Sequence, residues 1–400
     1  MDMISLHQAH QHISGLQPLQ PVAVPLDKAL GLVCAENTYA MANCPSIDSS
    51  LKDGFAVVSA DIAEASPLNP IRLSVSGVVV AGENVAARRV TPGNAIRIMT
   101  GATIPPGATA VLASEFAQID GDYLFAMADA SKGRNILVKG SDIQQGQLVL
   151  AKQTMLRPAS LGLLAAAGLK NVLCYPLPRV VVAATGNELV WPGESIGPGK
   201  VAASNMVLTE AELKVLGITA STILLRDNLE SLEEQFRELI SEVDVLITCG
   251  GVLDGDKDFT MKAMEQIGME KIFHRVRIGP GKGACMGRVG KALVFNLPGG
   301  PPSHQVALLL LALPGVRRLM GYKNFLPPKK ELYVTEELLG QKEWTQLIYG
   351  QVKMKNGTLF ASPLRGSGRL KAMAEANALI EIPEGIAVID NKTLAGAWFF

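Results

Sequence analysis

The pattern of apolar and polar positions divides the first 176 residues of the chain into three stretches. Residues 3–16 place apolar side chains at loosely helical spacing, which predicts a helical lead-in. From about residue 44 to residue 139 the pattern alternates instead, in runs such as Ile71–Val80 between Gly and Pro residues. This alternation predicts a compact, mostly β module. Residues 140–176 return to a helical pattern, clearest at Pro158–Gly168, so we expect the β module to be inserted within the first domain.

After Pro178 the pattern changes to alternating strands and helices. The expected elements are a strand at Val180–Ala184, a helix at Asn205–Leu216, a strand at Ala220–Leu225, a helix at Asn228–Ser241, a strand at Asp244–Cys249, a helix at Phe259–Ile267, and strands at Phe273–Ile278 and Ala292–Asn296. Such alternation predicts a sheet of mainly parallel strands covered by helices. A last apolar helix is expected at residues 301–320.

The C-terminal part of the chain has a different character. Pro327 and Pro328 mark a boundary, and Lys355–Gly357 beyond it has the sequence of a hairpin turn. We therefore expect a fold of the α/β plus β class in several domains. The expected domains are a helical N-terminal or linker domain at 1–45 and 140–176, an inserted β-rich domain at 46–139, a βαβ domain at 177–326 and a small C-terminal β domain at 327–400.

Four of the predicted strands run into loops of small or acidic residues. These loops are Thr185–Glu188, Cys249–Gly251, Pro280–Gly283 and Leu297–Pro301. Ligands of an open α/β sheet bind outside the carboxyl ends of its strands, where backbone N–H groups and helix N-termini gather. We therefore expect the four loops to share one sheet edge and to form a pocket for a polyanion. Glycine lets a ligand approach the backbone closely, and the candidate contacts of this kind are Gly186, Gly250, Gly251, Gly281, Gly299 and Gly300.

Three carboxylates follow the second of these loops. Asp254, Asp256 and Asp258 occupy alternate positions directly after the glycine pair. Two carboxylates about 4 Å apart repel by roughly 4 kcal/mol at an effective dielectric constant of about 20, so three converging acids need a cation or must splay apart. Mg²⁺ suits this site because it is a hard cation that takes oxygen ligands and bridges to phosphate. The alternative is that Asp256 or Asp258 caps the helix expected from Phe259.

Lys282 is the candidate cation of the third loop, although an isolated turn lysine is also typical of a solvated surface. The loop is not a Walker motif, because G-x-x-x-x-G-K-[ST] is absent from the chain, and Gly281–Gly283 does not form a G-x-G-x-x-G fingerprint. An ordinary P-loop or dinucleotide-binding domain is therefore disfavoured.

The overall composition narrows the class of partner and the compartment. The 37 basic and 37 acidic side chains balance, which disfavours nucleic acid and membrane partners and requires any anion site to be local. The five cysteines are scattered without a C-x-x-C pair, which argues against disulfides or structural zinc and favours a cytoplasmic location. The N-terminal residues lack a basic region followed by an apolar run, so we expect neither secretion nor a membrane span.

Nine short motifs follow one another in a specific order over nearly the whole chain. They are Val24–Gly31, Lys52–Ala56, Ile98–Ala102, Gly140–Asp142, Ala184–Leu189, Gly250–Val252, Leu297–Gly299, Arg365–Gly368 and Ala376–Asn377. In this order they resemble the molybdopterin molybdenumtransferase family, the enzymes of the last step of molybdenum cofactor synthesis, which also occur as the E domain of gephyrin. The resemblance implies an elongated homodimer of four-domain chains, with a cleft between the molybdopterin-binding α/β domain and the β module of the partner.

The resemblance also implies an activity. Members of the family bind molybdopterin-adenylate and molybdate, use Mg²⁺, cleave the adenylate with release of AMP and place molybdenum on the dithiolene sulfurs. Matched positions assign catalytic roles to Asp53, Thr100, Asp142, Glu188, Asp258 and Lys282. They assign substrate contacts to Asp227, Ser367 and Arg369, and they add Glu188 to the metal ligands Asp254, Asp256 and Asp258. A molybdopterin adenylyltransferase and recipient molybdoenzymes are the expected protein partners.

Several motifs depart from the family pattern. Gly279 and Leu137 stand where basic residues are usual, Gly300 replaces an asparagine, and Asn187 replaces an aspartate. Each lost charged contact would weaken anion binding by roughly 1.5–3 kcal/mol. Two interpretations therefore stay open: an active molybdenum insertase, and a catalytically weakened paralogue that acts as a molybdopterin-binding or scaffold protein. A third, an adenylyltransferase that makes the adenylate, would not require the flanking domains.

Overall fold

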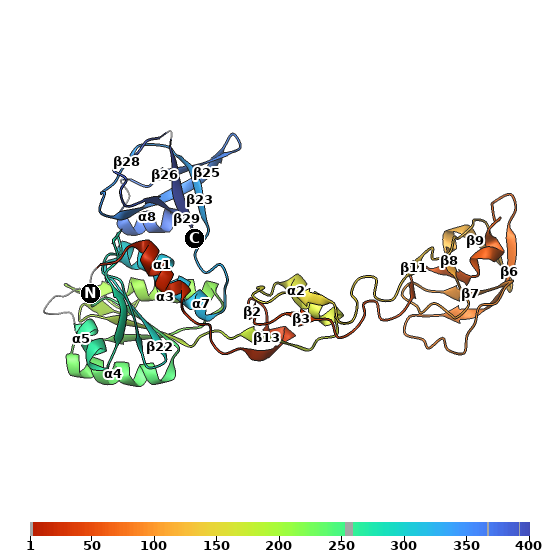
Figure 1. Cartoon of the computed structure of the whole chain (residues 1–400), viewed down its shortest axis with the longest axis horizontal. Helices are drawn as coiled ribbons and strands as arrows, with labels where there is room; N and C mark the ends of the chain where they lie inside the picture. Colours follow the sequence, from red (N-terminus) through yellow and green to blue (C-terminus); the bar gives the residue numbers. More distant parts are fainter. Residues whose placement is uncertain (1–2, 253–258, 366–367, 392) are drawn as a thin grey trace. The chain divides into compact units, whose positions relative to one another are not determined.

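The computed structural model describes residues 3–252, 259–365, 368–391 and 393–400 (Figure 1). The chain folds into two compact units. Unit 1 comprises Met1–Val22, Gly31–Ala35 and Leu173–Phe400, and unit 2 comprises Ala23–Leu30 and Glu36–Val172. This division is coarser than the four domains expected from the sequence, whose boundaries remain a prediction.

A six-stranded sheet forms the centre of the α/β part of unit 1. In spatial order its strands are β17 (Ser221–Leu225), β14 (Val180–Thr185), β18 (Val245–Cys249), β22 (Ala292–Leu297), β21 (Cys285–Val289) and β19 (Glu270–His274). The first four strands run parallel, and β21 runs antiparallel to both of its neighbours. The predicted parallel βαβ arrangement is therefore confirmed for β14, β17, β18 and β22.

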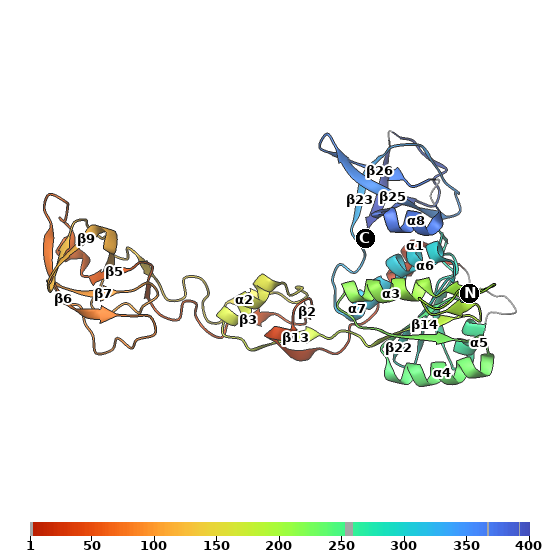
Figure 2. The same ribbon diagram turned by 180° about the vertical axis from the view of Figure 1, so that it is seen from behind.

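Helices cover both faces of this sheet because the side chains of its central strands β14 and β18 are apolar or small and point alternately to the two faces. The helices are α3 (Ser204–Val215), α4 (Leu229–Glu242), α5 (Phe259–Gln266) and α7 (Leu313–Leu319). Val180, Val182 and Ala184 of β14 belong to one apolar cluster, and Val181 and Ala183 belong to another. Figure 2 shows α3 and α7 on one face of the sheet and α4 and α5 on the opposite face. Alternate side chains of a strand thus fill two separate cores.

The predicted strand at Phe273–Ile278 is wrong in its extent. Strand β19 ends at His274 because Arg275 adopts a left-handed backbone conformation, with φ of 66°. The chain then forms β20 (Ile278–Gly279), which pairs with a strand of the C-terminal sheet. Strand β21 was not expected from the sequence, and it forms a hairpin with β22 through Gly290, whose φ is 56°.

The predicted helix at 301–320 is confirmed as a continuous helical segment. It consists of α6 (Pro301–Ala307), a π-helical turn at Leu308–Ala312 and α7. Pro314 has no N–H to donate to the carbonyl of Leu310, four residues earlier. Instead, the Nε2 atom of His10, from α1 (Leu6–Ser14), lies 2.9 Å from that oxygen. The N-terminal helix therefore supplies a partner to a carbonyl that lacks its usual α-helical N–H donor.

A second six-stranded sheet forms the C-terminal part of unit 1. In spatial order its strands are β20, β25 (Thr345–Lys355), β26 (Thr358–Pro363), β23 (Lys329–Val334), β29 (Leu394–Phe399) and β27 (Ala378–Ile382). The predicted hairpin turn is confirmed, because Asn356 and Gly357 join β25 to β26 with φ values of 51° and 77°. Two consecutive positive φ values are typical of a type I′ turn, which matches the twist of a hairpin.

Unit 2 contains a six-stranded β sheet, as the alternating pattern predicted. In spatial order its strands are β8 (Ala110–Ala113), β5 (Gly54–Val57), β7 (Asn94–Ile98), β6 (Ile71–Val79), β10 (Tyr123–Ala126) and β9 (Ala117–Asp120). Phe55, Leu112 and Leu124 are buried in its core. Unit 2 also contains the predicted helix of its later part, α2 (Pro158–Ala166), which begins with a proline in its first turn.

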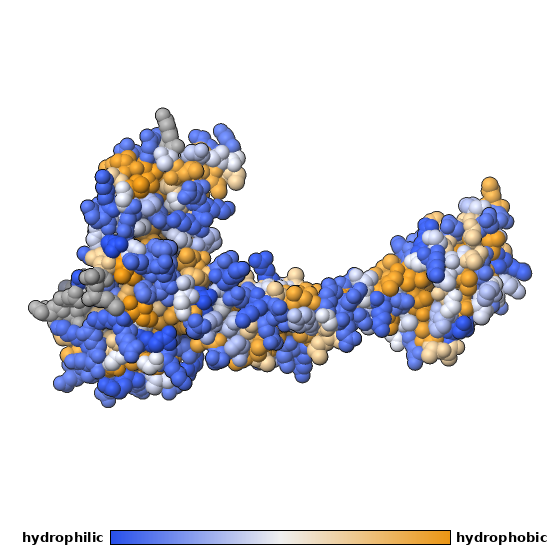
Figure 3. Space-filling model, viewed as in Figure 1, coloured by the Kyte–Doolittle hydropathy of each residue, from blue (hydrophilic) through white to orange (hydrophobic). Residues whose placement is uncertain are grey.

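The molecular surface is of mixed polarity. Figure 3 shows hydrophobic residues, in orange, on both units among a mostly hydrophilic surface. Exposed apolar side chains such as Leu68 and Met354 are ordinary in folded proteins. In the ranges that the structure describes, no helix is long and apolar enough to cross a membrane. Glu188, Asp227 and Lys282 line cavities in unit 1.

Candidate functional site

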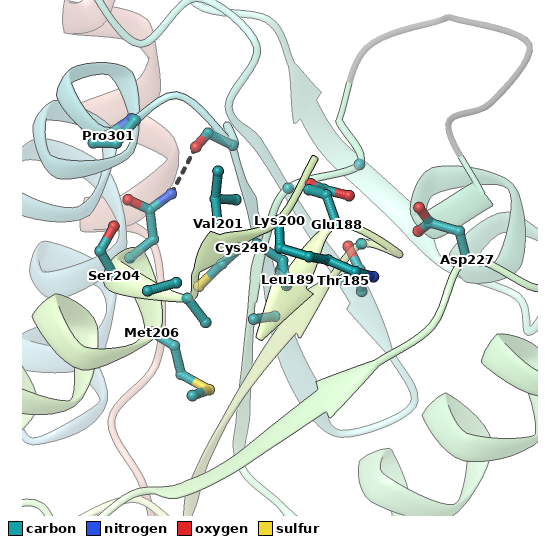
Figure 4. A pocket seen from close by; sticks show the side chains of 18 of the residues that line it. Thr185, Glu188, Leu189, Lys200, Val201, Ser204, Met206, Asp227, Cys249 and Pro301 are labelled. Carbon is teal, nitrogen blue, oxygen red and sulfur yellow. Dashed lines mark hydrogen bonds between the residues drawn. The ribbon is translucent and has the colours of Figure 1, made fainter. Parts of the chain in front are cut away.

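A cavity of about 740 Å³ lies at the carboxyl ends of β14 and β18 (Figure 4). Its walls include Gly186 and Glu188 after β14, Gly250 and Gly251 after β18, and Gly299 after β22. Because these three strands are parallel, their loops meet at the same sheet edge. Three of the four predicted loops therefore share one edge.

The fourth loop reaches the site by another route, which corrects the sequence prediction. Residues 280–283 follow β20, and β20 belongs to the C-terminal sheet through its pairing with β25. The loop nevertheless lines a second cavity, of about 510 Å³, together with Gly251, Gly299 and Gly300. The first and second cavities share Gly251 and Gly299 in their walls. Lys282 thus lies at a cavity that adjoins the one that contains Glu188.

The lack of a side chain at Gly186 allows the Glu188 carboxylate to lie against the backbone. The backbone of Gly186 has φ of 155°, and a Cβ atom built there would lie 2.7 Å from both carboxylate oxygens of Glu188. Any side chain at position 186 would therefore push the carboxylate away. The glycine is required for this close approach and not only for a turn.

Asp227 is tied to the same loop by two reciprocal hydrogen bonds. The backbone N–H of Asn187 donates to Asp227 Oδ2, and the N–H of Asp227 donates to Asn187 Oδ1, both at 3.2 Å. Partial burial raises the pKa of Asp227, and the nearby charge of Glu188 raises it further, whereas the Asn187 hydrogen bond opposes the increase. The uncharged Asn187 can satisfy both partners without adding a third carboxylate to this pair.

Two cations at this site were not found by the sequence reasoning. Lys200 lines the first cavity, and its Nζ donates to the carbonyl oxygen of Asn187 at 2.6 Å. Arg226 donates to the carbonyl oxygens of Asn187 at 3.3 Å and of Leu189 at 3.0 Å. Lys200 is brought there by the parallel pairing of β15 (Leu189–Val190) with β16 (Val201–Ala202). No local motif distinguishes this lysine from a solvated one, so only the strand pairing reveals it.

A buried polar group supports the floor of the first cavity. The Nε2 atom of His304 lies 2.7 Å from Thr209 Oγ1 and 4.0 Å from Cys249 Sγ. Burial lowers the pKa of His304 to about 4 and raises the pKa of the Cys249 thiol to about 12, so both groups are neutral near pH 7. Beside them, Asn205 Nδ2 donates to the carbonyl oxygen of Gly299 at 2.8 Å, the bond drawn dashed in Figure 4. These contacts position the loop and do not supply a nucleophile.

The second cavity contains Lys282 and an aromatic side chain. The Nζ atom of Lys282 lies 4.9 Å from the centre of the Trp344 ring. Gly281 precedes the lysine with φ of 116°, and a Cβ atom there would lie 2.8 Å from Ile278 Cδ1. Gln341 and Gln346 of the C-terminal domain complete the polar lining with Ser303.

Three predicted catalytic residues belong to unit 2. Asp53 Oδ1 accepts hydrogen bonds from both the backbone N–H and the hydroxyl of Thr100, each at 2.7 Å. These bonds are the main reason why the pKa of Asp53 is lowered, so its carboxylate is charged near pH 7. Asp142 is exposed, and its backbone N–H donates to the carbonyl of Cys44. The structure thus joins Asp53 to Thr100, and the catalytic role of all three residues remains a prediction.

The remaining predicted residues fall into two groups. Asp254, Asp256, Asp258 and Ser367 lie outside the described residues, as does the alternative in which Asp256 or Asp258 caps α5. Arg369 begins α8 (Arg369–Glu375) and lines a third cavity with Pro301 and Pro302. No group of three or more potential metal-binding side chains occurs within the described ranges. The magnesium site therefore stays a prediction.

The fold and the paired cavities define a multidomain protein that is built around a molybdopterin-binding type of α/β domain. Residues 181–318 match the family model of a probable molybdopterin binding domain. Residues 4–168 match the MoeA N-terminal region, domains I and II, and residues 334–391 match the MoeA C-terminal region, domain IV.

Proteins that are similar to this chain over nearly its full length identify the family. The chain is 30% identical to molybdopterin molybdenumtransferase 2 of Mycobacterium tuberculosis over 98% of both chains. It is 32% identical to the molybdopterin molybdenumtransferase of Bacillus subtilis over 90% of this chain and 86% of the relative. The crystal structure of a molybdopterin biosynthesis MoeA protein from Pyrococcus horikoshii aligns with a TM-score of 0.83 and 29% identity, over 100% of this chain and 99% of that one. The chain belongs to the molybdopterin molybdenumtransferase family, a family of enzymes, as its motifs predicted.

Proposed function

We propose that this enzyme inserts molybdenum from molybdate into adenylated molybdopterin, with Mg²⁺-dependent cleavage of the adenylate and release of AMP. The observation that carries the proposal is the adjacency of two cavities with different charged side chains. One contains Glu188 and Asp227, the other contains Lys282, and Gly251 and Gly299 line both. A substrate that bears both a phosphoanhydride and a metal-binding group needs such a pair.

The first cavity suits the phosphate-bearing part of the substrate. Its volume of about 740 Å³ lies within the range of cofactor pockets, roughly 300–1,000 Å³. Glycine backbones at positions 250, 251 and 299 allow close approach, and Lys200 supplies a positive charge. Phosphate oxygens would compete for the Lys200 ammonium with the carbonyl of Asn187, to which it is now bonded.

The carboxylates of the first cavity fit magnesium. Glu188 and Asp227 present hard oxygen donors, and their two negative charges lie close enough that the charge of Glu188 adds to the effect of partial burial in raising the pKa of Asp227, a repulsion that a divalent cation would relieve. When bound, Mg²⁺ would neutralise phosphate charge at this edge. Asp254, Asp256 and Asp258 are proposed to contribute further ligands. The Asp227 carboxylate is also proposed to orient the attacking oxygen by accepting a hydrogen bond from it.

The second cavity suits molybdate as a substrate. Lys282 supplies the positive charge and the side-chain amides of Gln341 and Gln346 supply hydrogen-bond donors for a tetrahedral oxyanion. In the proposed reaction the two dithiolene thiols form two Mo–S bonds, and one oxide ligand of molybdate leaves with the two thiol protons as water. A water molecule attacks a phosphorus of the phosphoanhydride, the bridging P–O bond breaks, and the products are AMP and the phosphate of molybdopterin.

The wider setting of this activity is also proposed. The chain acts as a cytoplasmic homodimer in which Asp53, Thr100 and Asp142 contribute to the cleft. It receives molybdopterin-adenylate from an adenylyltransferase and delivers the cofactor to molybdoenzymes. The support for the dimer, the location and the protein partners is the match of the chain's motifs to those of the family.

The decisive test supplies purified protein with molybdopterin-adenylate, molybdate and Mg²⁺ and measures AMP. Release of AMP that depends on molybdate, and that stops when EDTA removes Mg²⁺, supports the enzyme. The Glu188→Gln variant should lower the rate by about a hundredfold or more, as expected for loss of a group that stabilises the transition state.

The alternative function is that of a weakened paralogue that binds molybdopterin without turnover. The alternative is favoured because Gly279 and Gly300 stand where the family usually has a basic residue and an asparagine. Among the described residues that line the second cavity, Lys282 is therefore the one with a positive charge. Tight binding of molybdopterin-adenylate without release of AMP would support this alternative and refute the first proposal.

A further inference from the structure

Lys282 is held by a side chain from a different domain of unit 1. The loop that carries it is fixed by backbone hydrogen bonds from Val276 N–H to the Lys282 carbonyl and from Ala284 N–H to the Gly281 carbonyl, at 3.0 and 3.1 Å. The lysine side chain itself extends toward Trp344, with Nζ 4.9 Å from the ring centre. This distance is within the range of a cation–π contact.

The position of Trp344 is fixed as well. Its neighbour Thr345 pairs with Ile278 in the β20–β25 ladder, and the Thr345 N–H donates to the Arg277 carbonyl at 3.0 Å. Arg277 in turn forms a salt bridge with Glu384 of the C-terminal domain at 3.2 Å. The backbone beside Trp344 is therefore fixed against the strand that precedes the loop, and the indole lines the same cavity as Lys282.

We propose that Trp344 is a positioning residue, which holds the Lys282 ammonium toward the second cavity and so sets the affinity of that cavity for a tetrahedral oxyanion. This inference rests on the proposed function. The indole face covers one side of the ammonium, so the N–H groups on the other side remain available to a ligand. A lysine side chain that is already ordered loses less rotamer freedom when the oxyanion binds.

The contact also explains how one lysine, in a loop of otherwise small residues, can be sufficient to bind an oxyanion. Within the described part of the chain, no carboxylate pairs with Lys282, so its charge is available to an anion. The C-terminal domain contributes the ring instead of a second cation. A cation–π partner orders the lysine without neutralising it, whereas a carboxylate would repel the oxyanion.

The test measures binding of inorganic tungstate, a stable tetrahedral oxyanion, by isothermal titration calorimetry on the full chain. We expect Trp344→Leu to weaken binding about fivefold to twentyfold and Trp344→Phe to weaken it less, because phenylalanine keeps an aromatic face. Lys282→Met should weaken binding about tenfold or more. The thermal unfolding midpoint of each variant shows whether the fold is kept.

A double-mutant cycle separates positioning from packing. If Trp344 acts through Lys282, the Trp344→Leu change has no further effect on tungstate binding in a Lys282→Met background. Lys329 offers a control for the loss of a cation–π contact, because its Nζ lies 4.8 Å from the Trp398 ring outside the two cavities. Lys329 also pairs with Glu381 at 2.7 Å, so Lys329→Met should lower stability but leave tungstate binding unchanged.

Three results would overturn the inference: unchanged tungstate affinity in Trp344→Leu, an undiminished effect of that change in the Lys282→Met background, or no tungstate binding by the unaltered chain. The AMP-release assay on the unaltered chain stands apart from these outcomes. If the unaltered chain releases AMP and Trp344→Leu leaves tungstate affinity unchanged, the inference is refuted and the proposed function is not. An inactive chain whose tungstate binding follows the cycle refutes the proposed turnover alone.

Discussion

At the scale of single residues, the site depends on glycines, whose lack of a side chain leaves room for neighbouring groups. Replacing Gly186 with alanine would place Cβ 2.7 Å from both Glu188 carboxylate oxygens and force them to move. A displacement of about 1 Å can reduce a catalytic rate about a hundredfold, so we expect a loss of that order in AMP release. Gly193→Ala is the control, because Gly193 also has positive φ, 93°, but no atom lies near its Cβ position. Equal losses in both variants would point to backbone strain and not to the carboxylate.

A second prediction at this scale concerns His304 and pH. Burial lowers the pKa of His304 from 6.5 in the unfolded chain to about 4. Between these pH values the unfolded chain binds more protons, so His304 costs stability progressively as the pH falls from about 6.5 to about 4, and the loss is then constant. We expect the full loss to be roughly 3 kcal/mol, of which roughly 2 kcal/mol falls between pH 7 and pH 5. Urea unfolding of the unaltered chain and of His304→Gln at pH 7 and pH 5 checks it. The stability of the two proteins should change by different amounts, and parallel changes would contradict the prediction.

At the scale of elements, the helix that follows β22 fits the sheet only through a glycine. A Cβ atom at Gly315 in α7 would lie 2.4 Å from Phe295 Cζ of β22. We expect Gly315→Ala to destabilise unit 1 by about 1–3 kcal/mol, although alanine favours helices, because overpacking outweighs propensity. Gly162 is a matched control in the middle of α2, with open space at its Cβ position. Gly162→Ala should stabilise unit 2 by up to about 1 kcal/mol, and thermal unfolding of both variants measures the difference.

At the scale of the whole molecule, two compact units with no shared core predict two unfolding transitions. Leu112 is buried in the core of unit 2, and Leu246 is buried in the α/β core of unit 1. Each change to alanine should cost about 2–5 kcal/mol in its own unit. Differential scanning calorimetry should therefore show that Leu112→Ala lowers one transition and Leu246→Ala lowers the other. A single transition that both variants lower equally would show that the units unfold together.

Much of the fold could be predicted because local patterns agree with it. The runs of small and branched residues in β14 and β18 predicted buried parallel strands, and Asn356 with Gly357 predicted the hairpin turn. The failures have a shared cause. The end of β19 depends on the left-handed conformation of Arg275, and β20 takes its partner from a strand about 65 residues further along the chain. Neither fact leaves a local signal in apolar spacing.

The sequence by itself determined the family, the order of most elements and the glycines and acidic residues that follow the strands, because these follow from motif order and local periodicity. Only the tertiary structure decided which charges meet. It placed Lys282 beside Trp344, brought Lys200 to the carbonyl of Asn187 and joined Asp227 to the Glu188 loop. The physical reason is that these contacts arise from strand pairing and loop packing between distant segments, and side chains in such contacts have no fixed spacing along the chain.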